Sequence, residues 1–354
     1  MLDCDALDRN IARMAAFART QGLRLRPHAK THKSRAIAAR QAAAGAVGIC
    51  CATLWEAEQL AGAAPSILLT SPIAGASAAA RIAALLNRDV ALSIVVDHPA
   101  FLDALDAQLP AGRSLGIVID VDPGMGRSGV ASPQDAVTLA HVAAGRSGLR
   151  YDGIQFYCGS EQHIPTLAAR KAAIATRNLR LQATIGALTQ AGLPPSIVTG
   201  GGTGTHGIDA DAGLLTELQP GSYIFMDQDY GACELGGAGP FETALRVHAT
   251  VVSANHPGWV TIDAGIKALA TDSGQPLAQA GISAGSSYRF TGDEFGRLDL
   301  ADGASSPAVG DRIALTASHC DPTVNLHDVY HLTGSAVGGS VWPIDARGYG
   351  VPRD

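Results

Sequence analysis

The sequence predicts a (β/α)8 barrel followed by a mainly β domain. Over residues 5–230, short apolar runs alternate with alanine-rich helical stretches, which is typical of parallel strands joined by crossover helices. After about Tyr230 the chain changes to β-like runs punctuated by Gly and Pro, without a long helical period. A length of 354 residues suits one barrel with an added module. We therefore expect the barrel at 5–230 and the β domain at 231–354, joined by residues 1–4.

The elements of the barrel can be placed in order. Asp5–Thr20 carries apolar residues at helical spacing behind an acidic start, and Gly22 supplies a stop. Because barrel active sites gather at the C-terminal ends of the strands, function is expected where these runs end in polar or Gly-rich residues. Eight strands are expected, at Leu23–His28, Val47–Ala52, Ile67–Ser71, Ser93–Asp97, Gly116–Val121, Gly153–Cys158, Ile197–Thr199 and Tyr223–Asp227.

In the β domain the sequence predicts a further set of strands. Leu2–Asp3 is too short for a barrel strand, and we expect it to join this domain instead. The predicted strands are Leu245–Ser253, Trp259–Asp263, Asp311–Thr316 and Val329–Leu332.

Composition excludes several classes of function. A net charge of −6 without a dense Lys/Arg run gives no electrostatic footprint for nucleic acid or an anionic membrane. The longest apolar stretches are interrupted well before membrane-spanning length, so we expect a soluble cytoplasmic protein. The six cysteines form no CxxC pair, which argues against a disulfide framework or a zinc knuckle.

The first segment with chemical character is RPHAKTHK, residues 26–33, at the end of the first predicted strand. The chain has only four lysines, and Lys30 and Lys33 both lie here. Strand alternation would place Arg26, His28 and Lys30 on one polar face toward the barrel mouth. Nearby cations and partial burial lower a lysine's pKa and supply the free amine that attacks an aldehyde. The alternative is a basic surface loop.

A glycine-rich loop follows the seventh predicted strand. Its backbone N–H groups and hydroxyls could form an anion-binding nest, and barrel phosphate sites favour the loops after strands seven and eight. A plain turn is the alternative. The loop contains Thr199, Gly201, Gly202, Thr203 and Gly204, and Ser222 and Tyr223 at the next strand are further candidate phosphate donors.

A third segment, in the β domain, is SHCDPTVNLHD, residues 318–328. In an extended chain His319 and Asp321 project to the same side, so they could hold one divalent ion. A hydrogen-bonded structural pair is the alternative. Cys320 keeps another arrangement open, because a flipped segment would offer a thiolate and favour zinc.

Two strand ends add candidates at the barrel mouth. The loop after Asp120 contains the cation Arg127, with a solvated turn as the alternative. The segment after Gln155 brings Tyr157 and His163 toward the mouth, and His163 could act as a general base near neutral pH.

Several segments together resemble one enzyme family along nearly the whole chain. They are RPHAKTHK, GGGTGT, GSYIFMDQDYG, DAGIKA, SHCDPTVNLHD and VWPIDARG. They are similar to the D-threonine aldolase group, which is related to D-serine dehydratases and 3-hydroxy-D-aspartate aldolases. The resemblance implies a type III pyridoxal 5'-phosphate (PLP) fold, with an alanine-racemase-like barrel and a β domain, usually as a homodimer.

The resemblance also implies roles for individual residues. It places the Schiff base on Lys30 rather than Lys33, Arg127 near the cofactor's phenolic oxygen and Tyr157 near its pyridine nitrogen. Around the phosphate it implies Gly201, Gly202, Thr203, Gly204 and Tyr223.

In this family aldolases carry the metal on a His-x-Asp pattern, whereas related dehydratases tend to show His-x-Cys. Asp321 therefore favours aldol cleavage, with His319 and Asp321 as ligands of Mn2+ or Mg2+, or of Zn2+. The expected reaction cleaves a D-threonine-like 3-hydroxy amino acid to glycine and an aldehyde. The alternatives are a 3-hydroxy-D-aspartate aldolase releasing glycine and glyoxylate, and a D-serine or 3-hydroxyaspartate dehydratase releasing ammonia and a 2-oxo acid.

Overall fold

The computed structural model describes residues 1–335 and 339–350, and the chain forms two compact units. Unit 1 comprises Met1–Asn10, Ser222–Ala232 and Phe241–Arg347. Unit 2 comprises Ile11–Gly221, Cys233–Pro240 and the described part of Gly348–Asp354. No helix in the described part of the chain has the length and apolar character needed to span a bilayer.

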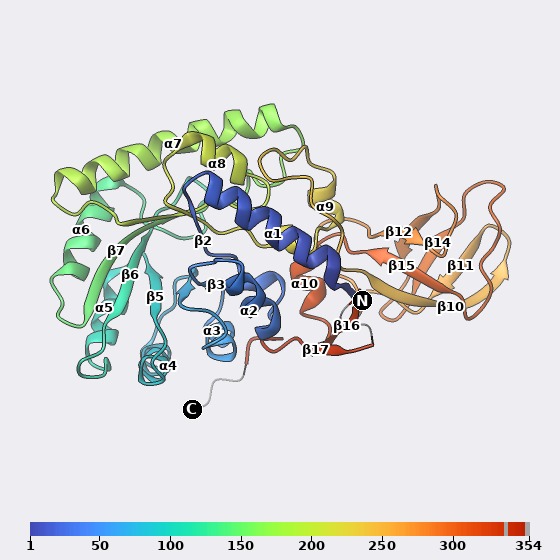
Figure 1. Ribbon diagram of the computed structural model, residues 1–354, viewed down its shortest axis with the longest axis horizontal. Helices are drawn as coiled ribbons and strands as arrows, with labels where there is room; N and C mark the ends of the chain where they lie inside the picture. The colour runs from blue at the N-terminus through green and yellow to red at the C-terminus, as the bar shows by residue number, and fades with distance from the viewer. Residues whose placement is uncertain (336–338, 351–354) are drawn as a thin grey trace. The chain divides into compact units, whose positions relative to one another are not determined.

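Unit 2 is built around an eight-stranded parallel sheet (Figure 1). Its strand order is β2-β9-β8-β7-β6-β5-β4-β3. The first and last strands meet through a parallel bridge between His28 and Cys50, with the Cys50 N–H donating to the Pro27 carbonyl at 2.8 Å. The sheet therefore curls into the predicted barrel. Its strands are β2 (Arg24–Leu25), β3 (Ile49–Cys51), β4 (Ile67–Leu69), β5 (Leu92–Val96), β6 (Leu115–Asp120), β7 (Leu149–Phe156), β8 (Ile197–Gly200) and β9 (Glu217–Leu218).

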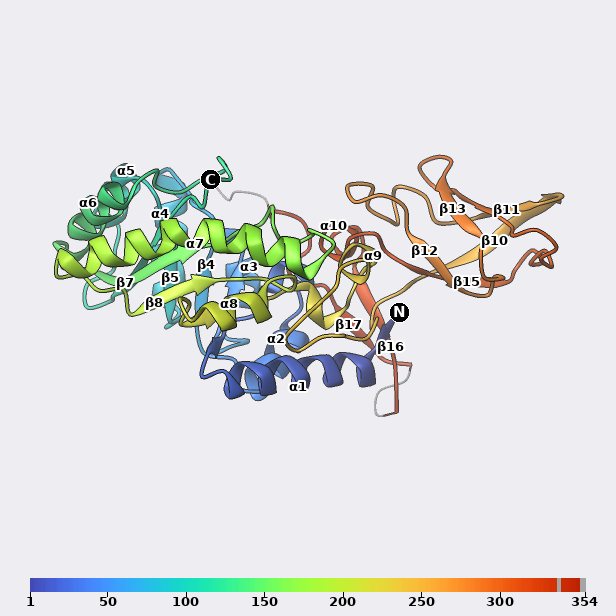
Figure 2. The same ribbon diagram turned by 90° about the horizontal axis from the view of Figure 1, so that it is seen from above.

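Helices connect successive strands of the barrel. The predicted first helix is confirmed as α1 (Cys4–Thr20). Side-chain caps start several others: the hydroxyls of Thr53, Ser132 and Thr166 each accept a hydrogen bond from an N–H in the first turn. Helix α6 packs against α7, and α7 lies beside α8 (Figure 2). These helices are α2 (Arg35–Ala43), α3 (Leu54–Leu60), α4 (Ala76–Asn87), α5 (Pro99–Asp106), α6 (Pro133–Ala144), α7 (Leu167–Gln190) and α8 (His206–Ala212).

The eighth strand is not the one that the sequence predicted. It is Glu217–Leu218, whereas the predicted Tyr223–Asp227 overlaps the 3-10 helix η2 (Ser222–Ile224). Glu217 obscures the strand, because a charged residue inside a barrel is unexpected without its partner. The Arg26 Nε donates to its Oε1 at 2.8 Å, so the two buried charges are paired. A strand was predicted at residues 223–227 because a short apolar run does not distinguish a buried strand from a buried helical turn.

Unit 1 is mainly β, as predicted. An antiparallel six-stranded sheet has the order β12-β15-β10-β11-β14-β13, and a smaller sheet has the order β1-β16-β17. Leu2–Asp3 forms β1 and pairs in parallel with β16, which confirms that it joins the β domain. The larger sheet buries an apolar cluster that includes Val251, Ile262 and Leu315.

The remaining elements of unit 1 are short. Strands β12, β13, β14 and β17 were not predicted from sequence, and β12 shows why: its sequence LAQA is largely exposed and lacks clear alternation. Strands and helices of the unit are β10 (Val247–His256), β11 (Trp259–Ile262), β12 (Leu277–Ala280), β13 (Ser287–Phe290), β14 (Gly296–Asp299), β15 (Arg312–Thr316), β16 (Val329–Thr333), β17 (Val341–Pro343), α9 (Gln228–Gly231) and α10 (Cys320–Val324).

Candidate active site

Lys30 lies in a 3-10 turn rather than on a strand. Strand β2 ends at Leu25, and Ala29–Thr31 form the turn η1, whose N-cap His28 accepts a hydrogen bond from the Lys30 N–H through Nδ1. The predicted alternation of Arg26, His28 and Lys30 along one extended face is therefore wrong. Pro27 has no N–H to donate, although the N–H groups of Arg26 and His28 on either side donate to the Leu218 and Pro220 carbonyls.

A pocket at the C-terminal ends of the barrel strands surrounds Lys30. The structure brings three predicted residues together here, since Lys30, Arg127 and Tyr157 all line it. The Arg127 guanidinium carbon lies 5.8 Å from the centroid of the Tyr157 ring. The full lining is His28, Lys30, Ala52, Thr70, Ser71, Arg127, Gln155, Tyr157 and Gln219.

A hydrogen-bond network fixes the polar side chains of this pocket. His28 Nε2 lies 3.0 Å from Thr70 Oγ1. The Gln155 amide donates to Asp120 Oδ1 at 2.9 Å, and the Gln219 amide donates to Thr199 Oγ1 at 2.9 Å. Thr199 is thus buried, and its hydroxyl accepts a hydrogen bond from the Gln219 side chain. His28 was expected at the barrel mouth and lines the pocket, whereas sequence reasoning missed Gln155 and Gln219 as lining residues, because their partners lie on other strands.

The other three lysines are engaged elsewhere. Lys33 Nζ donates to Glu56 Oε1 at 2.6 Å, and both side chains are buried. Lys171 and Lys267 are exposed and lie beside acidic residues, Asp211 and Glu294 respectively. Lys30 is therefore the only one of the chain's four lysines that lines the pocket.

The glycine-rich loop is tightly built. Gly201 has φ +67°, and a Cβ there would lie 2.7 Å from Asp209 Oδ2, so only glycine fits without strain. The Gly202 N–H donates to Thr205 Oγ1 at 3.1 Å, and the Gly204 N–H donates to Gln162 Oε1 at 3.0 Å. Two of the amides expected to form a phosphate nest thus bind protein acceptors, and a phosphate at this loop would need its other donors.

His206 holds the end of this loop. Its Nδ1 lies 2.8 Å from the Thr203 carbonyl, and its Nε2 accepts a hydrogen bond from the Ala238 N–H at 2.8 Å. Burial lowers the pKa of His206 to about 4, so the ring is neutral at physiological pH. A neutral ring with Nδ1–H satisfies both contacts, which fixes the tautomer.

Asp209 lies behind the same loop. Its side chain is buried, and burial raises its pKa to about 7 although the Thr205 hydroxyl stabilises the ionised form. Its Oδ2 has no hydrogen-bond partner within the described residues. An ionised carboxylate here would be costly.

The predicted metal pair lies in unit 1. Cys320–Val324 forms the short helix α10 and His319 precedes it as N-cap, so the expectation of an extended segment is wrong. The two side chains nevertheless face each other, with His319 Nε2 4.0 Å from Asp321 Oδ2. On the other edge of the imidazole, Nδ1 lies 2.6 Å from Asp272 Oδ2. Sequence reasoning missed Asp272.

Cys320 is turned into the interior. Its side chain is 1% exposed, its N–H donates to Asp227 Oδ2 at 3.0 Å, and its sulfur lies 3.7 Å from the Met226 carbonyl oxygen. Burial raises the pKa of the thiol well above its usual value. The predicted alternative of a thiolate ligand therefore has no support in this geometry.

The donor atoms of His319 and Asp321 suit a divalent ion. Across residues 1–335 and 339–350, no group of three or more His, Cys, Asp or Glu side chains is arranged to hold a metal. One imidazole and one carboxylate would leave the remaining positions to water or substrate. Burial alone would lower the pKa of His319, but the carboxylates of Asp321 and Asp272 outweigh it and raise the pKa.

The remaining predicted residues are not among those that line the Lys30 pocket. His163 is half-buried in the turn after β7. Ser222 and Tyr223 are buried in η2, and the Tyr223 ring meets the Phe241 ring edge-on at 5.6 Å. Their roles stay predictions.

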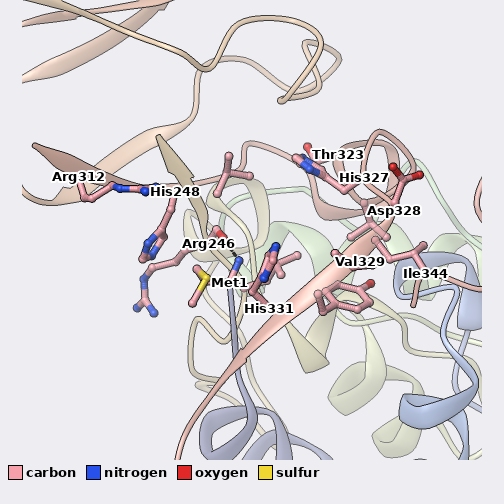
Figure 3. A pocket seen from close by; sticks show the side chains of 14 residues that line it. Met1, Arg246, His248, Arg312, Thr323, His327, Asp328, Val329, His331 and Ile344 are labelled. Atoms are coloured by element: carbon pink, nitrogen blue, oxygen red, sulfur yellow. Dashed lines mark hydrogen bonds between the residues drawn. The ribbon is translucent and has the colours of Figure 1, made fainter. Parts of the chain in front are cut away.

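A separate hollow of about 390 Å³ lies in unit 1 (Figure 3). Met1, Arg246, His248, His327 and His331 contribute side chains to it. It contains neither His319 nor Asp321, so it is distinct from the candidate metal pair.

Comparison with known families covers most of the chain. Residues 2–229 match the family described as alanine racemase, N-terminal domain, and residues 244–333 match a putative serine dehydratase domain. The fold thus belongs to the type III class of PLP-dependent enzymes. Alanine racemase from Bacillus anthracis shares the fold, with a TM-score of 0.71 at 14% identity.

Similar proteins define the family more narrowly. The chain is 37% identical to D-threonine aldolase from Arthrobacter sp. and 36% identical to 3-hydroxy-D-aspartate aldolase from Paracoccus denitrificans (strain Pd 1222). Each match covers 99% of this chain and 92% of the relative. The crystal structure of D-threonine aldolase from Filomicrobium marinum matches with a TM-score of 0.93 at 37% identity, over 98% of this chain and 94% of that one. The chain belongs to the D-threonine aldolase family of PLP-dependent lyases.

Proposed function

We propose that the protein is a PLP- and metal-dependent aldolase that cleaves D-configured 3-hydroxy amino acids to glycine and an aldehyde. D-Threonine-like substrates are the first candidates, and 3-hydroxy-D-aspartate, which would give glycine and glyoxylate, is the second. Both follow from the activities in the names of the relatives.

The observation that carries the proposal is the arrangement at residues 319–321. The Asp321 carboxylate faces His319 Nε2, whereas the Cys320 thiol is buried beside the Met226 carbonyl oxygen. Carboxylate with imidazole suits Mn2+ or Mg2+ better than a thiolate site would. A divalent ion bound there lowers the pKa of a hydroxyl that it contacts, which promotes loss of the β-hydroxyl proton.

The barrel pocket suits the organic cofactor. Lys30 is the lysine that lines this pocket and the proposed site of the Schiff base, and Arg127 and Tyr157 supply polar groups at the pocket wall. Thr199, Gly201, Gly202, Thr203 and Gly204 lie at the strand end where barrels bind phosphate, and Ser222 and Tyr223 are proposed as further donors. When bound, PLP accepts the electron pair that the broken Cα–Cβ bond leaves behind.

His163 is proposed as the base that takes the hydroxyl proton. Neutral imidazole near physiological pH accepts and returns protons readily. Lys30 would hold the cofactor through its ε-amine before substrate binds and again after glycine leaves. A homodimer and a cytoplasmic location remain predictions from the family resemblance and the composition.

A dehydratase is the second candidate function. D-threo-3-hydroxyaspartate dehydratase from Delftia sp. (strain HT23) is 32% identical over 336 residues, and its structure matches with a TM-score of 0.83. One structure of a D-threo-3-hydroxyaspartate dehydratase is described as a cysteine-to-alanine mutant in the metal-free form. Here aspartate stands at the position of the pattern where dehydratases tend to carry cysteine, which favours the aldolase.

Product identification tests the proposal. Purified protein loaded with PLP is incubated with D-threonine, 3-hydroxy-D-aspartate and D-serine, with and without Mn2+, and with L-threonine as a control for configuration. Glycine and an aldehyde, formed from D-substrates only and dependent on Mn2+, are expected. Ammonia with a 2-oxo acid would show a dehydratase, and cleavage at full rate after chelation would remove the metal from the proposal.

A further inference from the structure

We propose that Asp272 is a positioning residue of the metal site, which holds the Nδ1 edge of His319 so that Nε2 is presented to a divalent ion beside Asp321. The inference rests on the proposed function, because it takes His319 and Asp321 as the metal ligands. It adds a third side chain whose oxygen contacts the ligand rather than the ion.

The two nitrogens of His319 face different carboxylates. Nδ1 lies 2.6 Å from Asp272 Oδ2, a hydrogen-bond distance, whereas Nε2 lies 4.0 Å from Asp321 Oδ2. The longer separation lies outside hydrogen-bonding range. Nε2 and Oδ2 are therefore close to each other without a hydrogen bond between them, and both are candidate metal ligands. The ring is thus divided into an edge held by protein and an edge that faces the second proposed ligand.

The backbone before Asp272 is attached to α10, so the contact is not a chance meeting of surface side chains. The Ala270 N–H donates to Thr323 Oγ1 at 3.1 Å, and the Ser318 hydroxyl donates to the Ala270 carbonyl at 3.2 Å. His327 Nε2 lies 2.9 Å from the Ala268 carbonyl oxygen. Residues on both sides of His319 therefore fix the segment that carries Asp272.

The contact between Asp272 and Nδ1 matches a common arrangement around metal-binding histidines. A histidine binds a metal through one neutral ring nitrogen, and a carboxylate that accepts a hydrogen bond from the other nitrogen fixes both tautomer and ring orientation. With Nδ1–H donated to Asp272, the lone pair lies on Nε2, toward Asp321. Removing such a partner typically weakens metal binding about 10- to 100-fold.

Asp272 has little to contribute as a core residue. Its side chain is 48% exposed, compared with 24% for His319. Substitutions at Asp272 are therefore expected to leave folding intact, and a change in metal affinity can be separated from a loss of structure.

The test measures Mn2+ binding in the PLP-loaded full chain without substrate, from the electron paramagnetic resonance signal of free Mn2+. Asp272→Ala is expected to weaken binding about 10- to 100-fold. Asp272→Asn, which keeps an acceptor oxygen, is expected to lie between it and the unchanged protein. Asp302→Ala removes another exposed carboxylate of unit 1 and serves as the matched control.

A second measurement reads the ring directly. Nitrogen-15 NMR of the metal-free protein, recorded at an alkaline pH where the imidazole is neutral and with the His319 signals assigned by their loss in His319→Gln, is expected to show protonated Nδ1 in the unchanged protein. Asp272→Ala is expected to shift it toward a mixture of tautomers. Equal Mn2+ affinity in Asp272→Ala and Asp302→Ala, or an unchanged tautomer, would overturn the inference.

The outcome is independent of the reaction catalysed. If Mn2+ binding depends on Asp272 but no glycine forms from any D-substrate, the aldolase proposal fails and the positioning role stands. If glycine forms but Mn2+ affinity does not respond to Asp272, the positioning role fails alone.

Discussion

Lys33 Nζ and Glu56 Oε1 lie 2.6 Å apart in a buried ion pair. The other Glu56 oxygen accepts the Ala52 N–H at 2.6 Å, which ties the pair to the end of β3. Two lysines three positions apart in the sequence thus lie in different environments. The Lys33 amine is bound in a buried ion pair, whereas Lys30 lines the pocket.

Substituting each lysine should give different results. Lys30→Ala is expected to abolish the visible absorbance of bound PLP while leaving stability nearly unchanged. Lys33→Ala should keep that absorbance but lower the free energy of unfolding by about 3–5 kcal/mol, because it leaves a buried carboxylate unpaired. Absorbance spectra and urea denaturation of both variants check this, and retention of the band in Lys30→Ala would assign the Schiff base elsewhere.

Asp321 and Cys320 should separate in the same way. Asp321→Ala is expected to remove Mn2+-dependent turnover while PLP stays bound, because it deletes one of the two proposed ligands. Cys320→Ala, which deletes a buried thiol that is not a proposed ligand, is expected to retain metal-dependent turnover with some loss of stability. Turnover as a function of Mn2+ concentration is the measurement, and full activity of Asp321→Ala would contradict the metal assignment.

His163→Ala tests the proposed base. A positioned general base contributes about 10²- to 10⁴-fold, so carbon–carbon cleavage should slow by that order while PLP absorbance stays unchanged. His141→Ala, an exposed histidine on α6, is the control. Unchanged single-turnover cleavage in His163→Ala would leave the base to another residue.

Asp209 predicts a pH dependence of stability. Its pKa rises from an ordinary value of 3.8 to about 7 because of burial, so folding favours the protonated form. The contribution of the protonated carboxyl to the free energy of unfolding is fully present below about pH 4 and is lost as the pH rises through about 7. Its upper limit is about 4 kcal/mol. Asp209→Asn should therefore stabilise the protein at pH 8 but hardly at pH 4, as measured by urea denaturation. An equal effect at both pH values would exclude the titration of Asp209 as its cause.

The sequence predicted what depends on local pattern. Leu115–Asp120 is buried throughout, and its apolar run was recognised as a strand. Glu217 was not, because its burial depends on Arg26, 191 positions away. Asp272 was missed for the same reason, since its partner His319 lies 47 positions further along the chain. Contacts between distant charged residues leave no periodic signal.

The bridge between His28 and Cys50 closes the barrel two residues before Lys30. A cofactor bound covalently to Lys30 would therefore lie next to the seam where the first and last strands of the sheet meet. Opening of that seam exposes the Cys50 amide to solvent deuterium, and a ligand that binds only the closed form slows such opening. Loading with PLP should accordingly slow amide exchange at Cys50 more than at Val118, which lies in the middle of the sheet. Loss of the cofactor and opening of the barrel would then both depend on the same local equilibrium between the closed and open seam.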